Sequence, residues 1–154
     1  MKITRFGIGP AIALPAAVLS LATWLATSAW PAVFLLRFPA ALRIGGAALV
    51  ALGLVMWGAG GVKVMRAYNR GELLTTGVYA LVRNPMYAGW ITLVFPGLAL
   101  LTGWWLFLLV ALLGYVMFTL LIHHEDDYLE GRFGKAYVAY RGRVNAVVPI
   151  PRFR

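Results

Sequence analysis

Long stretches of this chain carry no charged residue, and their lengths predict helices that cross a membrane. No Asp, Glu, Lys or Arg occurs within residues 6–36, 44–62 or 84–122. These windows hold 31, 19 and 39 residues, and one helical crossing of the hydrocarbon core needs about 20 apolar residues. A helix over the whole third window would be about 58 Å long, roughly twice the thickness of the core, so this window must fold back on itself.

The third window is predicted to turn at Thr102-Gly103, directly before the aromatic pair Trp104-Trp105. Glycine permits a tight turn, and Trp residues are typical of the membrane interface. Four crossings result, so we expect an all-α integral membrane protein with about four transmembrane helices. The predicted spans cover residues 8–30, 43–63, 86–102 and 104–122.

The composition agrees with a protein embedded in lipid. Hydrophobic residues make up 62% of the 154 residues and charged residues 12%, with a mean hydropathy of +0.81, whereas a soluble domain carries about 25% charged residues. We expect one membrane-embedded domain over residues 1–154, with a tail at 123–154. The first apolar run follows Lys2 and Arg5 as in a signal peptide, but it is longer than a signal core of about 7–15 residues. The absence of Cys excludes disulfides and thiolate chemistry from the sequence given.

Basic residues are distributed unevenly between the two sides of the membrane. With four crossings, both termini and the segment between the second and third spans share one side. The opposite side holds only Arg37 and Arg43, and the positive-inside rule therefore places both termini in the cytoplasm. We expect the inner (plasma) membrane of a prokaryote, with the net charge of +9 attracting anionic lipids rather than nucleic acid. The basic side holds Lys2, Arg5, Lys63, Arg66, Arg70, Arg83, Arg132, Lys135, Arg141, Arg143, Arg152 and Arg154.

Small residues and one proline predict how the spans pack. Gly46, Gly53 and Gly60 recur every seven residues along the second span and predict a seam of close helix contact. Pro96 lies inside the third span and should kink it. After the fourth span, apolar residues three or four apart predict an amphipathic cytoplasmic helix, broken near Phe133-Gly134. Its stripe consists of Leu129, Phe133, Tyr137, Tyr140 and Val144.

Two polar clusters flank the third and fourth spans. One covers residues 77–89 at the entry to the third span, and the other covers residues 123–127 at the exit of the fourth. An antiparallel hairpin of these spans would bring the clusters side by side, at the N-terminus of a helix that favours negative charge. Ordinary interfacial anchors and solvated charges would explain the same residues. A metal site is a further alternative, formed by His123, His124 and Asp127.

The first cluster resembles the signature Gly-Pro-Tyr-x-x-Val-Arg-His-Pro-x-Tyr-x-Gly of the isoprenylcysteine carboxyl methyltransferase family. The tail is similar to the same family's pattern Glu-Glu-x-x-Leu-x-x-x-Phe-Gly-x-x-Tyr-x-x-Tyr. The resemblance covers about residues 72–151, with the two motifs in the family's order. The matching residues of the first motif are Gly77, Tyr79, Val82, Arg83, Pro85, Tyr87 and Gly89, and those of the second are Glu125, Leu129, Phe133, Gly134, Tyr137 and Tyr140.

The resemblance implies a membrane methyltransferase that uses S-adenosyl-L-methionine in a cytoplasm-facing pocket rather than in a Rossmann fold. It implies catalytic roles for Glu125 and Arg83. Arg83 suits the methionine carboxylate, because a guanidinium can make two parallel hydrogen bonds. Glu125 suits the cofactor ammonium or the substrate. The implied cofactor-binding residues are Tyr79, Leu81, Val82, Arg83, Asn84, Pro85, Tyr87, Gly89, His124, Glu125 and Asp126.

Two departures from the family pattern leave the methyl acceptor open. Asn84 stands where the family has His and cannot take up a proton, and Asp126 stands where it has a second Glu. The run from Asn84 to Gly89 also resembles phospholipid N-methyltransferases, so an amine headgroup is an alternative to a lipidic or small hydrophobic acceptor. A small four-helix transporter or a structural subunit is the alternative of another class. Proton-coupled transporters place an acidic residue inside a span, and the four predicted spans hold none.

Overall fold

The computed structural model describes residues 7–150, apart from the side chains of Tyr68 and Asn69. Helices account for most of these residues, and the described part of the chain holds an isolated bridge between Leu35 and Trp104 but no strand. The predicted all-α class is confirmed. The elements are α1 (Gly9–Ala29), α2 (Pro31–Phe34), α3 (Ala40–Arg70), α4 (Val78–Leu81), α5 (Pro85–Ala88), the π-helix η1 (Gly89–Val94), α6 (Phe95–Thr102), α7 (Leu106–Phe133) and α8 (Lys135–Arg143).

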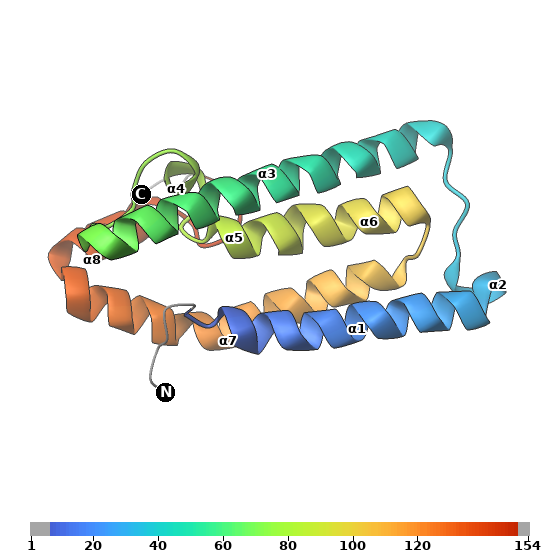
Figure 1. Ribbon diagram of the computed structural model, residues 1–154, viewed down its shortest axis with the longest axis horizontal. Coiled ribbons are helices and arrows are strands. Elements are labelled where there is room, and N and C mark those ends of the chain that lie inside the picture. Colours follow the sequence, from blue (N-terminus) through green and yellow to red (C-terminus); the bar gives the residue numbers. More distant parts are fainter. Residues whose placement is uncertain (1–6, 151–154) are drawn as a thin grey trace.

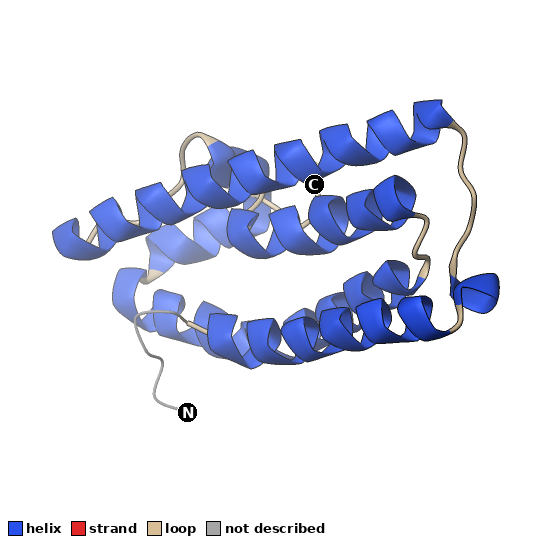
Figure 2. Ribbon diagram, turned by 45° about the vertical axis from the view of Figure 1, so that its right-hand side comes forward, coloured by secondary structure: helices blue, strands red, loops and turns tan. Residues whose placement is uncertain are grey.

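Four long helical segments lie side by side: α1, α3, the continuous run α5–η1–α6, and α7 (Figures 1 and 2). Each is long and apolar enough to cross a membrane, and each overlaps one of the four predicted spans. Large apolar side chains are exposed along them, including Leu14, Ile44, Val55 and Leu120. An exposed apolar surface of this extent is suited to lipid rather than water. The chain is therefore an integral membrane protein.

The turn inside the third window lies where the sequence predicts it. Helix α6 ends at Thr102, and Gly103 follows in the left-handed conformation with φ of 80°. The Gly103 carbonyl accepts a hydrogen bond of 2.8 Å from the amide of Leu36, which fixes the turn to the α2–α3 connection. Helices α6 and α7 consequently run antiparallel and in contact.

The glycines of α3 form the predicted packing seam. A Cβ atom on Gly46 would lie 2.7 Å from the Gly97 carbonyl oxygen, and one on Gly53 would lie 2.8 Å from the Gly89 carbonyl oxygen. A Cβ atom on Gly60 would lie 3.1 Å from the ring of Pro85 at the start of α5. Helix α3 thus packs along the whole third span, with backbones closer than any side chain would allow.

Pro96 acts through a π-helical turn rather than through a simple kink. The proline lies in the first turn of α6, directly after η1, where the amide of Phe95 donates to the Trp90 carbonyl five residues earlier. Because proline has no N–H, widening the preceding turn accommodates the ring without breaking the helix. Thr92, within η1, donates its hydroxyl to the Ala88 carbonyl at 2.7 Å.

Helix α7 continues beyond the predicted fourth span and carries the second polar cluster on its last turns. It ends at Phe133, and Gly134 adopts φ of 54° before α8 begins, which confirms the predicted break. The start of α1, the short helix α4 and α8 lie at the same end of the bundle (Figure 1). This end holds both predicted clusters. Four of the basic residues in the predicted asymmetry, Lys2, Arg5, Arg152 and Arg154, lie outside the described residues.

Candidate active site

Arg83 and Asp126 form a buried ion pair that joins the two clusters. Arg83 lies in the short link between α4 and α5, and its Nη1 donates to Asp126 Oδ1 at 2.7 Å and to the Tyr137 hydroxyl at 2.9 Å. The Tyr137 hydroxyl in turn donates to Asp126. The side chains of Arg83 and Asp126 are only 6% and 13% exposed. One nitrogen of the guanidinium is therefore occupied by protein groups from α7 and α8.

Glu125 faces a different set of partners from its neighbour Asp126. The Tyr87 hydroxyl lies 3.4 Å from Glu125 Oε2, and the backbone amide of Ile8 also donates to this carboxylate. Adjacent residues on a helix point about 100° apart, which separates the two carboxylates. Asp126 is matched with a cation, whereas Glu125 is held by a hydroxyl and an amide.

Two buried donors beside this pair have no hydrogen-bond partner in the described part of the chain. They are Arg83 Nε and Asn84 Nδ2, on side chains whose residues are 8% and 9% exposed. The backbone amides of Arg83 and Asn84 are satisfied, because they donate to the carbonyls of Asn145 and Ala146 at 2.8 and 2.9 Å. Leaving a buried donor unpaired costs about 1–3 kcal/mol. An acceptor from a bound ligand could therefore form hydrogen bonds with these two donors.

Tyrosines fix α4 and α8 around the cluster. Tyr79 donates to the Gly60 carbonyl at 3.3 Å, and its own carbonyl accepts from the Tyr140 hydroxyl at 2.5 Å. Burial raises the pKa of Tyr79 and Tyr137 well above the usual value of 10 and that of Tyr140 to about 12. For Tyr137, the hydrogen bond to Asp126 raises the pKa further. These hydroxyls stay protonated at neutral pH and act as donors.

Other predicted site residues hold helices together. Pro85 and Gly89 face Gly60 and Gly53 of α3, so their close contacts are with the packing seam. His124 lies with Nδ1 3.3 Å from the carbonyl of Leu121, within its own helix. No three His, Asp or Glu side chains within residues 7–150 gather in a way that could hold a metal ion.

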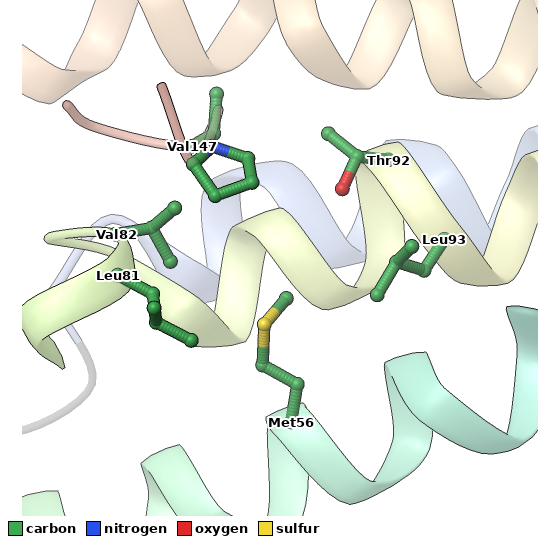
Figure 3. A pocket seen from close by; sticks show the side chains of 7 residues that line it. Met56, Leu81, Val82, Thr92, Leu93 and Val147 are labelled. Carbon is green, nitrogen blue, oxygen red and sulfur yellow. The ribbon is translucent and has the colours of Figure 1, made fainter. Parts of the chain in front are cut away.

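An apolar cavity of about 270 Å³ lies beside the polar cluster. It lies between α3, the end of α4, η1 and the segment after α8 (Figure 3). Two of the predicted residues, Leu81 and Val82, form part of its wall, and Arg83 and Asn84 directly follow Val82 in the chain. The full lining consists of Met56, Leu81, Val82, Thr92, Leu93, Val147 and Pro149.

Several residues of this region were not predicted as site residues. Tyr137 and Tyr140 belong to the second motif, so the resemblance offered a signal for both. Ile8 and the cavity-lining Met56 carry no motif, and only the three-dimensional packing brings them to the cluster.

Comparison with known proteins agrees with both motifs. A family model described as phospholipid methyltransferase matches residues 36–136, about two thirds of the chain. The chain belongs to this family. The match includes the first cluster, Glu125 and Asp126, and most of the second motif. It confirms the methyltransferase kinship that the two motifs predict.

A second comparison finds a relative among the isoprenylcysteine methyltransferases. The chain is 35% identical over 83 residues to the protein-S-isoprenylcysteine O-methyltransferase of Schizosaccharomyces pombe. The aligned part is 53% of this chain and 35% of the relative, so the chain spans about a third of the length of the protein it matches. No solved structure matches the chain.

Proposed function

We propose that this protein is a membrane methyltransferase that uses S-adenosyl-L-methionine and methylates a lipidic or small hydrophobic acceptor, in the manner of the isoprenylcysteine carboxyl methyltransferases. The observation that carries the proposal is the juxtaposition of three features at one end of the bundle. These are the unpaired donors of Arg83 and Asn84, the carboxylate of Glu125, and the apolar cavity behind Val82. Family membership supports methyl transfer as the chemistry.

The residues present fit the polar part of such a cofactor. Its methionine portion carries a carboxylate, which would accept hydrogen bonds from Arg83 Nε and Asn84 Nδ2, the two buried donors that lack a partner. Asp126 occupies the Nη1 side of the guanidinium, so the Nε side is the one that would bind the carboxylate. Asp126 then acts on the cofactor indirectly, because it orients Arg83. Tyr137 supports both side chains from α8.

S-adenosyl-L-methionine supplies an activated methyl group on a positively charged sulfur. The protein's contribution is to position the acceptor and to keep water away, because the charge on sulfur disappears during transfer and a dry site favours that loss. Val82, Tyr87 and Phe118 provide this dry surrounding, since they belong to or pack against the core at the same end. Glu125 lies at the border between this core and the polar cluster.

The role of Glu125 depends on the acceptor. A carboxylate acceptor arrives deprotonated and needs no base, so Glu125 would then bind the cofactor ammonium. An amine acceptor must lose a proton, and Glu125, which has no cationic hydrogen-bond partner within residues 7–150, could accept it. Phospholipid amine methylation is the second candidate function, and the family model that matches the chain favours it.

The apolar cavity is suited to the hydrocarbon part of the acceptor. Its walls include Met56 of α3 and Leu93 of η1, both in membrane-spanning segments, and Val82 next to the polar cluster (Figure 3). A chain seated there would extend from the lipid toward the donors of Arg83 and Asn84. We place this end of the bundle in the cytoplasm, following the distribution of Lys and Arg. Reporter fusions at both termini test this orientation, and an external C-terminus would overturn it.

The experiment that tests the function measures transfer of labelled methyl groups by the detergent-purified protein. The acceptor panel contains prenylcysteines, phospholipid amines and small hydrophobic thiols. We expect Glu125→Gln to abolish transfer and Asp126→Asn to impair it, while Asp127→Asn stays near wild type because Asp127 is exposed. An inactive Asp127→Asn beside a normal Glu125→Gln would show that the carboxylates are wrongly assigned.

A further inference from the structure

The start of α1 lies directly against the carboxylate of Glu125. The backbone amide of Ile8 donates to this carboxylate. A Cβ atom added to Gly7 would lie 3.1 Å from Glu125 Oε2, closer than an ordinary contact. Gly7 also has φ of 57°, a conformation that residues with a side chain rarely adopt. Glycine thus lets the chain pass Glu125 at this distance.

Ile8 anchors this segment in the protein core. Its side chain is 0% exposed and belongs to the same buried cluster as Val82, Phe118 and Val147. These residues come from the α4–α5 link, from α7 and from the segment after α8. Since these neighbours of Ile8 belong to three other elements, the amide that contacts Glu125 is held in place as well.

Tyr87 holds Glu125 from the third span. Its hydroxyl lies 3.4 Å from Oε2, and its ring packs on Phe118 with centroids 5.4 Å apart. The carboxylate therefore lies between a donor from α5 and a donor from the start of α1. Displacing a catalytic group by about 1 Å can cost on the order of 100-fold in rate. Holding Glu125 between these two donors should therefore affect the rate of methyl transfer.

We infer that residues 7 and 8, at the start of the first helix, position the Glu125 carboxylate for methyl transfer. The inference rests on the proposed function of Glu125. It assigns a role to a segment that lies outside residues 36–136, the part matched by the family model. Gly7 and Ile8 are positioning residues, because they act through Glu125 and not on the acceptor.

The first test compares Gly7→Asn with Gly9→Ala. Asn tolerates the left-handed conformation better than other residues with a side chain, so the main effect of Gly7→Asn is the added Cβ beside Glu125. Gly9→Ala is the matched control, because its Cβ would lie 3.7 Å from the Tyr87 hydroxyl, an ordinary contact. We expect kcat of Gly7→Asn to fall roughly tenfold or more. Where Glu125 is the base for an amine acceptor, the KM for S-adenosyl-L-methionine should stay within about twofold, and where Glu125 binds the cofactor ammonium, this KM should rise as well. An unchanged kcat would overturn the inference.

The second test does not depend on activity. Unfolding midpoints in detergent are compared for the wild type, Gly7→Asn, Glu125→Ala and the double variant. If the new side chain acts through Glu125, the fall in midpoint caused by Gly7→Asn should shrink by about half or more once the carboxylate is removed. Equal falls in both backgrounds would overturn the inference. If the wild type methylates no acceptor, the proposed function fails, and this cycle still decides whether the start of α1 holds Glu125.

Discussion

Replacing Asp126 by Asn removes the negative charge that faces the buried guanidinium of Arg83. The Nη1–Oδ1 distance is 2.7 Å, and the two side chains are 6% and 13% exposed. Removing one partner of a buried pair typically costs about 3–5 kcal/mol, because the other charge stays buried without compensation. The Asn oxygen can still accept one hydrogen bond from Arg83, so we expect the lower end, about 3 kcal/mol. Denaturant unfolding in detergent micelles measures this loss.

Two further variants separate the ion pair from general damage to α7. Asp127→Asn changes an exposed neighbour and should stay within about 0.5 kcal/mol of the wild type. The double variant Arg83→Met with Asp126→Leu replaces the pair by apolar side chains, which are often as stabilising as a buried pair. It should be more stable than Asp126→Asn, although it would lose the cofactor donors. A loss below about 1 kcal/mol in Asp126→Asn would refute the argument that Arg83 depends on this carboxylate.

Two other predictions concern packing and alkaline pH. Gly53→Ala should destabilise the protein by about 1–3 kcal/mol, because its Cβ would lie 2.8 Å from the Gly89 carbonyl oxygen. A Cβ atom on Gly58 of the same helix would meet no described atom of another segment within 4 Å, so Gly58→Ala should cause no loss in the same unfolding assay. Since burial raises the pKa of Tyr140 from 10 to about 12, the unfolded chain ionises first and stability should fall between these two values. Tyr140→Phe should lessen this fall in unfolding curves recorded across that range, and an identical fall would contradict it.

The arrangement of the spans could be predicted well from the sequence because the membrane imposes strict demands. Hydrocarbon excludes charge and requires helices of a minimum length, so charge-free windows locate the crossings. Gly103 marks the turn, since a left-handed residue is needed between α6 and α7. The glycines of α3 mark the seam for the same steric reason. The π-helix before Pro96 was not predicted, because proline alone does not specify how the preceding turn adjusts.

The pairing of charges at the site could be predicted only in part. The two motifs bring Arg83 near two adjacent carboxylates, and the spacing along a helix indicates that these point in different directions. Which of them meets Arg83 depends on the rotation of α7 against α5, and tertiary packing around Phe118 sets that rotation. The contact of Ile8 with Glu125 carries no sequence signal, since a backbone amide supplied by a distant segment leaves no motif.

The central claim is tested most directly by binding of S-adenosyl-L-methionine to the detergent-purified protein, measured by calorimetry for the wild type, Arg83→Lys and Arg132→Lys. Lysine keeps the charge opposite Asp126 but cannot offer the second side of a planar fork. We expect the wild type to bind and Arg83→Lys to bind roughly tenfold more weakly or worse, as for the loss of one charge-assisted hydrogen bond. Arg132→Lys, an exposed change, should bind like the wild type. Equal affinity in Arg83→Lys would reduce Arg83 to a structural ion pair, and no binding by the wild type would contradict the account.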